Sequence, residues 1–136
     1  SAIQLAMAFS VFANDGVLKG FQLVDEKDQN NPSQVISKHT AELIMESLEQ
    51  VIIDGTGSQA KHHLHIVAGK TGTSHKVSNG KYDKSKYISS FIGIGPLETK
   101  KYTILVTIDE PGLNRYSGGE VAAPVFKEIF DDLVSL

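Results

Sequence analysis

The hydrophobic pattern changes from a helical period to a strand period after Gly57, and this change constrains the fold more than any other feature of the sequence. Residues 2–13 are apolar almost all round and predict a buried helix that stops at an Asn-Asp-Gly segment. A second helix is predicted between an N-cap at Ser37 and a glycine-rich end at residues 55–57. Its core-facing stripe consists of Ala41, Ile44, Met45, Leu48, Val51 and Ile52.

Three strand-like segments follow, at residues 64–73, 87–94 and 102–109. A polar stretch, residues 74–86, separates the first two, and a turn separates the last two. Consecutive strands with turn connections favour a three-stranded antiparallel meander.

A final helix is predicted after the paired glycines Gly118 and Gly119. Its apolar face consists of Val125, Phe126, Ile129, Phe130, Leu133 and Val134, and its polar face of Lys127, Glu128, Asp131 and Asp132. This helix should cover one face of the sheet. The order helix, helix, three-strand meander, helix predicts an α+β fold.

The whole chain is expected to form a segment of one domain, with residues 1–58 mainly helical and residues 59–136 forming the sheet part with the final helix. Within the first part, residues 17–18 and 21–24 are typical of a small hairpin or an extended excursion. The polar residues 25–32 predict a surface loop.

Composition narrows the function classes. A chain of 136 residues with 40% hydrophobic residues can bury a core, which excludes disorder as its main state. The net charge of -3 argues against a nucleic-acid partner, and the absence of cysteine excludes disulfides and thiolate metal sites. No apolar run approaches the roughly 20 residues that span a bilayer. A start at Ser1 inside an apolar run suggests a processed product or a fragment.

Three weak motifs favour structural interpretations. Residues 55–60 have the glycine spacing of a dinucleotide-binding turn, but they close a helix instead of opening one. Residues 69–71 resemble the end of a phosphate-binding loop that lacks its first glycine. His62, His63 and His65 have no carboxylate or fourth ligand nearby in sequence, so surface polar residues are favoured over a metal site.

The segment 68–74 is the most informative part of the chain. On a strand, Thr71 and Thr73 present two hydroxyls on one face, Lys70 supplies a positive charge, and Gly72 permits close approach of another backbone or a ligand. Together these groups suit a carboxylate ligand. The Lys-Thr-Gly tripeptide alone would favour a plain turn after a strand.

Residues 3–16, 67–73, 87–96, 102–111 and 118–126, taken in order, resemble the class B penicillin-binding transpeptidases of the septal, penicillin-binding protein 3 type. The resemblance implies a partial penicillin-binding-protein/serine β-lactamase-like fold. It also implies a parent enzyme that cross-links peptidoglycan stem peptides at the division septum through a serine acyl-enzyme and binds penicillin. No cofactor is implied.

The resemblance also implies partners and location. A stem peptide or a β-lactam would bind, the N-terminal half of the domain would complete the site, and division proteins would contact the parent. The parent would be anchored in the bacterial inner membrane with this segment in the periplasm. Because the strand at residues 102–109 pairs in the family with a strand from that N-terminal half, we expect an open edge that favours self-association.

Residue roles follow from the resemblance as well. Lys70 would favour the substrate carboxylate electrostatically and bond the serine of a Ser-x-Asn motif. Thr71, Gly72 and Thr73 would line the carboxylate site, and the backbone N–H of Thr73 would be one oxyanion donor. Asp109, Glu110 and Glu120 are interpreted as turn and cap carboxylates, as their places at strand or helix ends indicate.

The nucleophile of the family belongs to a Ser-x-x-Lys motif on a helix. The sequence has two chance matches, Ser58 with Lys61 and Ser78 with Lys81, and both lie in loop-like segments. It contains no Ser-x-Asn. The chain is therefore expected to lack a nucleophile and to be inactive alone. The alternatives are a segment of a serine β-lactamase, a D,D-carboxypeptidase or a β-lactam sensor, a non-catalytic interaction module, or a nucleotide binder.

Overall fold

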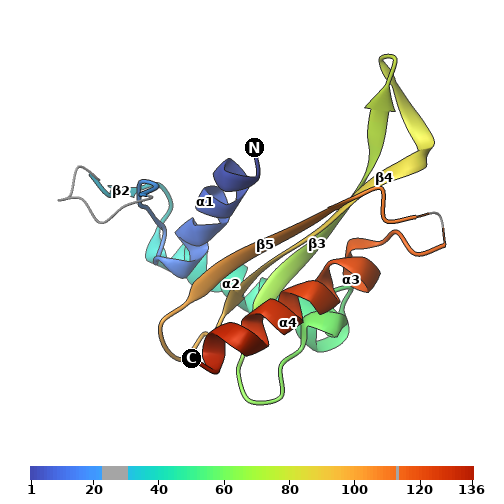
Figure 1. Cartoon of the computed structure of the whole chain (residues 1–136). Helices are drawn as coiled ribbons and strands as arrows, with labels where there is room; N and C mark the ends of the chain where they lie inside the picture. The colour runs from blue at the N-terminus through green and yellow to red at the C-terminus, as the bar shows by residue number, and fades with distance from the viewer. Residues whose placement is uncertain (23–30, 113) are drawn as a thin grey trace.

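The computed structural model describes residues 1–22, 31–112 and 114–136. Its elements, shown in Figure 1, are α1 (Ala2–Ala13), β1 (Val17–Leu18), β2 (Ser33–Gln34), α2 (Lys38–Asp54), the 3-10 helix η1 (Ser58–Ala60), β3 (Ala68–Ser78), β4 (Lys81–Gly95), β5 (Tyr102–Asp109), α3 (Gly118–Val121) and α4 (Ala123–Val134). Strands β3, β4 and β5 form one antiparallel sheet in that order. The predicted α+β class with a three-stranded meander is confirmed.

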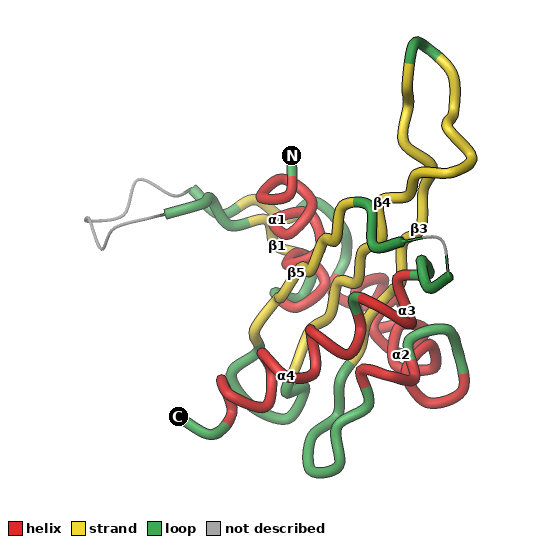
Figure 2. The backbone as a smooth tube through the Cα atoms, turned by 45° about the vertical axis from the view of Figure 1, so that its right-hand side comes forward, coloured by secondary structure: helices red, strands yellow, loops and turns green. Residues whose placement is uncertain are grey.

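Side-chain alternation along β4 gives the sheet two buried faces. Phe91 points toward α4, whereas Ile92 and Ile94 point to the opposite face, and all three side chains are buried. Helices α3 and α4 cover the first face, α1 packs against β4 and β5, and α2 contacts β3 (Figure 2).

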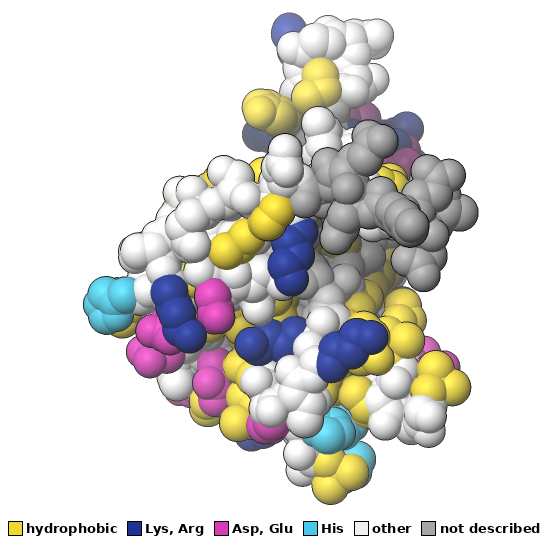
Figure 3. Space-filling view, turned by 90° about the vertical axis from the view of Figure 1, so that its left-hand side faces the viewer, with side chains coloured by type: hydrophobic (Ala, Val, Ile, Leu, Met, Phe, Trp, Pro, Cys, Tyr) yellow, Lys and Arg dark blue, Asp and Glu magenta, His cyan; other side chains and the backbone are white. Residues whose placement is uncertain are grey.

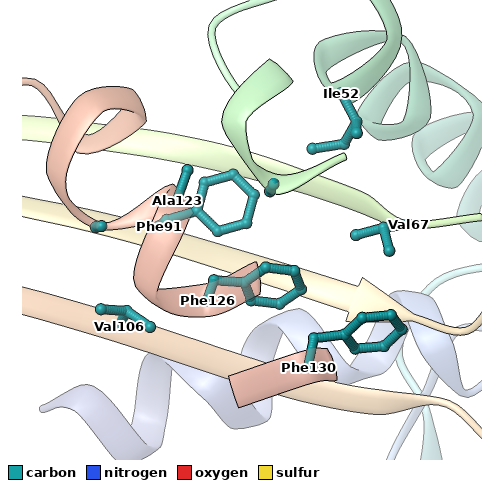
Figure 4. Close-up of a cluster of buried hydrophobic side chains, with 9 residues drawn as sticks. Ile52, Val67, Phe91, Val106, Ala123, Phe126 and Phe130 are labelled. Atoms are coloured by element: carbon teal, nitrogen blue, oxygen red, sulfur yellow. The ribbon is translucent and has the colours of Figure 1, made fainter. Parts of the chain in front are cut away.

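The main core lies between α4 and the sheet (Figure 4). The ring centroids of Phe91 and Phe126 are 4.9 Å apart, and those of Phe126 and Phe130 are 5.8 Å apart. A Cβ atom at Gly93 would lie 2.5 Å from the Phe126 ring, and one at Gly95 would lie 3.0 Å from the Phe130 ring. The glycines of β4 therefore make the room that the two phenyl rings of α4 fill.

The final helical segment differs from its prediction in two ways. It consists of two helices, α3 and α4, because the chain breaks its helical course at Ala122 before Pro124. Only Ala123, Phe126 and Phe130 of α4 are fully buried, while Val125 and Ile129, predicted on the apolar face, are 36% and 40% exposed. The face of α4 that packs on the sheet is therefore narrower than the apolar stripe of its sequence.

The prediction that residues 2–13 form a helix is confirmed, but the prediction that this helix is buried is wrong. Only Val11 is buried in α1, and Ile3 and Leu5 are about half exposed, at 51% and 48%. Helix α1 packs on the sheet and contacts α2 and β1, but much of its N-terminal half stays exposed. None of the described helices combines the length and apolar character that crossing a bilayer requires.

The second predicted helix is confirmed. Ser37 Oγ accepts a hydrogen bond from the Thr40 N–H at 3.0 Å, and Gly55 ends α2. Ala41, Leu48 and Ile52 of the predicted stripe are buried. Before α2, β1 pairs with β2, which confirms a short extended excursion at residues 17–18. The strand-like residues 21–24 and the loop predicted at 25–32 lie partly outside the described residues.

The first strand begins later than predicted, at Ala68 instead of residue 64. The N–H groups of Leu64 and His65 donate to His62 Nδ1 at 3.1 and 3.0 Å, and that of Ile66 donates to Glu98 Oε1 at 2.8 Å. Because side chains take these backbone donors, residues 64–66 do not join the ladder with β4.

The polar stretch 74–86 is not a separate loop but an extension of β3 and β4 into a projecting hairpin (Figure 1). Asn79 and Gly80 form its turn with positive φ angles of 51° and 75°, the backbone that two-residue hairpins favour. The pairing shifts between His75 and Lys76, so residues 84–86 of β4 form a bulge. The Asn-Gly pair was the sequence signal for this hairpin.

His62 is buried, with a side chain only 3% exposed, so its interpretation as a surface residue is wrong; His63 is exposed. The His62 ring packs edge-to-face with Phe130, with their ring centroids 5.4 Å apart, and His62 Nε2 lies 3.1 Å from Asp131 Oδ1. Since Nδ1 accepts two backbone hydrogen bonds, the ring is neutral with its proton on Nε2. Protonation of Nδ1 would displace both donors.

We predict that acid destabilises this fold through His62. Burial lowers its pKa below the ordinary 6.5, against the opposing charge of Asp131. The unfolded state therefore binds the His62 proton at a higher pH than the folded state does. The free energy of unfolding should be constant above about pH 6.5. It should fall as the pH drops from about 6.5 to the lower pKa of the folded state. Thermal unfolding followed by circular dichroism between pH 5 and 8 measures this.

The variant His62→Gln should be less stable at neutral pH and should lose much of the decline below pH 6.5. His63→Gln, which changes an exposed neighbour, is the matched control and should keep the decline. Equal pH dependence in the wild type and His62→Gln would contradict the assignment.

Candidate functional site

The candidate site is the stretch Lys70–Thr73 in the first half of β3. In the described part of the chain β3 pairs only with β4, with Thr71 opposite Phe91 and Thr73 opposite Ser89. Opposite residues of an antiparallel pair share a face, so Thr71 and Thr73 lie on the face that α3 and α4 cover. The two hydroxyls share one face, as the sequence predicted.

Lys70 stands next to these hydroxyls. Its Nζ lies 3.2 Å from the backbone oxygen of Thr71 and donates to Thr71 Oγ1 at 3.3 Å, and the side chain is exposed. Thr71 Oγ1 is also 2.9 Å from Thr56 Oγ1. An ammonium group and hydroxyls on neighbouring residues can hold a carboxylate by charge-assisted hydrogen bonds.

Sequence reasoning missed Thr56, which follows the end of α2. The sequence around residues 55–57 indicates only a helix terminus and a weak dinucleotide motif. Its Thr-to-Thr contact spans 15 residues of sequence and joins the end of α2 to the candidate site. Nothing in the residue types around Thr56 indicates that pairing.

The N-terminal end of α3 packs directly on this strand. The Gly118 N–H donates to Thr73 Oγ1 at 3.0 Å, and a Cβ atom at Gly118 would lie 2.5 Å from the backbone oxygen of Gly72. A Cβ atom at Gly72 would lie 2.5 Å from Ser90 Oγ. The backbone of α3 therefore approaches Gly72 closely, one of the two approaches expected there, and Ser90 Oγ lies where a Cβ of residue 72 would be.

An aromatic row continues the same face of the sheet beyond Thr73. The ring centroids of His75 and Tyr87 are 4.6 Å apart, and those of Tyr87 and Tyr116 are 4.1 Å apart and nearly parallel. Ser89 Oγ donates to the backbone oxygen of Tyr116. Desolvation, assisted by Tyr116, raises the pKa of Tyr87, so its phenol stays neutral. The sequence analysis did not identify this row.

The three carboxylates interpreted as turn and cap groups lie at element ends. Glu120 Oε2 accepts from Ser117 Oγ at 2.7 Å, and Ser117 caps α3. Asp109 ends β5, Glu110 follows it, and both bind Lys76. These carboxylates serve structural contacts, and none contacts Lys70–Thr73 among the described residues.

The two Ser-x-x-Lys matches lie outside the α-helices. Ser58 begins η1, with Lys61 just after it, and Ser78 pairs with Lys81 across the hairpin turn. Neither serine has a lysine one α-helical turn away. The described residues also hold no cluster of three histidines or carboxylates arranged for a metal ion.

Comparison with known families gives one match that covers nearly the whole chain. Residues 1–131 match the family model described as the penicillin binding protein transpeptidase domain. "Probable peptidoglycan D,D-transpeptidase PenA" of Neisseria flavescens is 36% identical over 137 residues, covering 100% of this chain and 34% of the relative. "Peptidoglycan D,D-transpeptidase FtsI" of Buchnera aphidicola is 33% identical over 141 residues, covering 98% of this chain and 24% of the relative.

Solved structures agree. The transpeptidase domain of penicillin-binding protein 3 from Burkholderia pseudomallei superposes with a TM-score of 0.84 at 34% identity, covering 99% of this chain and 42% of that one. Penicillin-binding protein 3 from Mycobacterium tuberculosis, solved with aztreonam, gives 0.84 at 27% identity, covering 99% and 35%. The chain thus spans about a third or less of the curated relatives described above.

Substitution of Gly118 tests the packing of α3 on the candidate strand. Gly118→Ala would place a methyl group against backbone atoms that cannot rotate away, so α3 must shift. We expect the free energy of unfolding to fall by about 1–3 kcal/mol, the usual cost of overpacking. Denaturant unfolding measures it.

Gly80→Ala is the control, because a Cβ atom there meets nothing within 4 Å and costs only the left-handed backbone, about 1 kcal/mol. An unchanged free energy of unfolding in Gly118→Ala would show that the contact is looser than described.

Proposed function

Because the chain belongs to the penicillin-binding protein transpeptidase domain family, class B, we propose that it supplies the carboxylate-binding part of a serine-type peptidoglycan D,D-transpeptidase. The observation that carries the proposal is the conjunction of Lys70 with the hydroxyls of Thr71 and Thr73 on one strand, with Thr73 held by Gly118. The substrate class is a peptidoglycan stem peptide with a free carboxylate, and β-lactams compete for the same groups.

Each residue has a physical role in this proposal. Lys70 attracts the carboxylate and stabilises it as a fixed positive charge, while Thr71 and Thr73 donate hydroxyl hydrogen bonds. The backbone N–H of Thr73 is proposed as an oxyanion donor. A preorganised donor of this kind lowers an acyl-transfer barrier by roughly 3 kcal/mol, because it meets charge that develops only in the transition state.

The nucleophile has to come from elsewhere in a complete transpeptidase domain. The matched Burkholderia domain is more than twice as long as the part that this chain covers, and we propose that the remainder supplies the activated serine and the Ser-x-Asn serine. In this proposal residues 1–136 form a segment of one domain, and its residue roles operate only when the two parts are joined.

The cellular role is also a proposal. We place the parent enzyme at the division septum of a bacterium, anchored in the inner membrane with this segment in the periplasm, where division proteins contact it. The support is the likeness to enzymes named as FtsI and penicillin-binding protein 3. The open edge of β5 remains a proposed surface for self-association of the chain when it is separate from its partner segment.

Lys70→Ala tests the proposed site. In a protein with the whole transpeptidase domain, this change should lower the acylation rate by a fluorescent penicillin by about a hundredfold. The reason is that loss of a charged hydrogen-bond partner in a binding site costs a few kcal/mol. His63→Ala, at an exposed residue outside the site, is the control and should acylate like the wild type. Equal rates for the wild type and Lys70→Ala would overturn the assignment.

The chain alone should form no covalent adduct with penicillin. Neither Ser58 nor Ser78 has a lysine base placed by an α-helix, and a carboxylate site cannot replace a nucleophile. The chain is incubated with fluorescent penicillin, denatured and examined for retained label. Stoichiometric labelling would contradict this expectation, and peptide mapping would then identify the reactive serine.

A further inference from the structure

We propose that Lys76 is a positioning residue for the carboxylate-binding strand, acting through the loop that joins β5 to α3. This inference rests on the proposed function, since it assigns to Lys76 the placement of Gly118 against Thr73. Lys76 lies three residues beyond Thr73, where the hairpin leaves the sheet, and does not itself contact Lys70–Thr73 among the described residues.

The side chain of Lys76 binds two carboxylates at the end of β5. Its Nζ lies 2.9 Å from Asp109 Oδ1 and 2.8 Å from Glu110 Oε1, and the side chain is 28% exposed. Lys86 Nζ lies 3.5 Å from the same Glu110 oxygen. Because β4 separates β3 from β5, these contacts span the width of the sheet.

A β-bulge occurs next to Lys76, where its side chain extends toward β5. The register shifts between His75 and Lys76, so residues 84–86 of β4 have no partner on β3. The bulge is held by Asp83, whose Oδ1 accepts from the Ser85 N–H at 2.9 Å and from Ser85 Oγ at 2.6 Å. Bulges commonly redirect a side chain, and here the redirected side chain is that of Lys76.

Glu110 begins the loop to α3 with an unfavourable backbone conformation. Its φ angle is 52°, in the left-handed region that costs a non-glycine residue about 1 kcal/mol or more. Three contacts hold it: the ion pair with Lys76, the longer ion pair with Lys86, and the hydrogen bond from its N–H to the Tyr87 oxygen at 2.9 Å. Without Lys76, one of these constraints on the loop's starting direction is gone.

The loop then returns to the candidate site. Tyr116 stacks on Tyr87, its backbone oxygen accepts from Ser89, and Gly118 donates to Thr73. Described contacts therefore lie at both ends of the loop: Lys76 binds Glu110 at its start, and Tyr116 and Gly118 contact the sheet and Thr73 at its end. The hydrogen bond from Gly118 fixes the Thr73 hydroxyl, so the direction in which the loop starts bears on the site.

The charges around this ion pair keep it formed. Hydrogen bonding to Lys76 lowers the pKa of Glu110, and hydrogen bonding to Glu110 and Asp109 raises that of Lys76. Lys86 adds a second positive charge, and Asp83 lies opposite Lys76 in the ladder. All of these groups are solvent-accessible, so the pair acts as a geometric restraint more than as a large source of stability.

The test uses a protein with the whole transpeptidase domain and the variant Lys76→Met, which keeps most of the length of the side chain and removes its charge. The rate constant for acylation by fluorescent penicillin should fall about tenfold, a partial loss because Lys86 remains near Glu110. Lys76→Arg should restore it to within about threefold. Lys84→Met, at an exposed lysine of the same hairpin with no ion pair among the described residues, should leave it unchanged.

Two further measurements separate positioning from stability. Amide hydrogen exchange in Lys76→Met should increase in residues 110–118 and not in α2, whereas a general loss of stability would raise both. The double variant Lys76→Met with Glu110→Gln should lose less activity than the two single losses combined, because both changes remove the same Lys76–Glu110 ion pair.

Any one of three results would overturn the inference. These are an acylation rate in Lys76→Met equal to that of the wild type, failure of Lys76→Arg to restore the rate, and hydrogen exchange that rises equally throughout the domain. If the wild-type domain itself were not acylated, the proposed function would fail, and the exchange measurement would still decide whether Lys76 positions the loop.

Discussion

The close contact between Gly118 and β3 is the constraint on which the rest of the site depends. At this point the backbone of α3 reaches the backbone of Gly72, with no side chain between them, and the Gly118 N–H meets Thr73 Oγ1 at 3.0 Å. Helix α4 follows directly and packs its phenyl rings on the glycines of β4. Packing in the core therefore fixes the positions of α4 and α3, and α3 in turn fixes the position of the Thr73 side chain.

The sequence could predict those parts of the fold whose determinants are local. Helix α2 was predictable because its apolar stripe and the Ser37 cap lie within the element itself. The meander and the Lys70–Thr73 strand were predictable because strand pattern and turn residues alternate along the chain. The start of β3 was not predictable, because it depends on His62 and Glu98 taking the N–H groups of residues 64–66.

Burial was the least predictable property. His62 is polar and lies among other histidines, yet Phe130 and Asp131 of α4 enclose it. The apolar helix α1 shows the opposite case, with an apolar groove between it, β1 and the residues after β2, lined by Met7, Val11, Phe12, Leu18, Val35 and Ile36. Figure 3 shows hydrophobic side chains exposed among charged ones on this side of the molecule. Exposed hydrophobic patches of this kind are typical of interaction surfaces.

In the proposed function the site is divided between two parts of one domain, and this division has a consequence for its chemistry. A carboxylate-binding strand orients a substrate, and an oxyanion donor stabilises its transition state, but both effects multiply the rate of a reaction that the nucleophile begins. In the proposed function, Lys70, Thr71 and Thr73 accelerate no reaction until a serine is placed within reach of the bound carbonyl. A rigid strand, locked by Gly118 on one face and supported at its far end by Lys76, can present the substrate at a fixed position to residues that another segment carries. In that proposal, such rigidity allows two parts of one domain to meet with the accuracy of a few tenths of an ångström that acyl transfer requires.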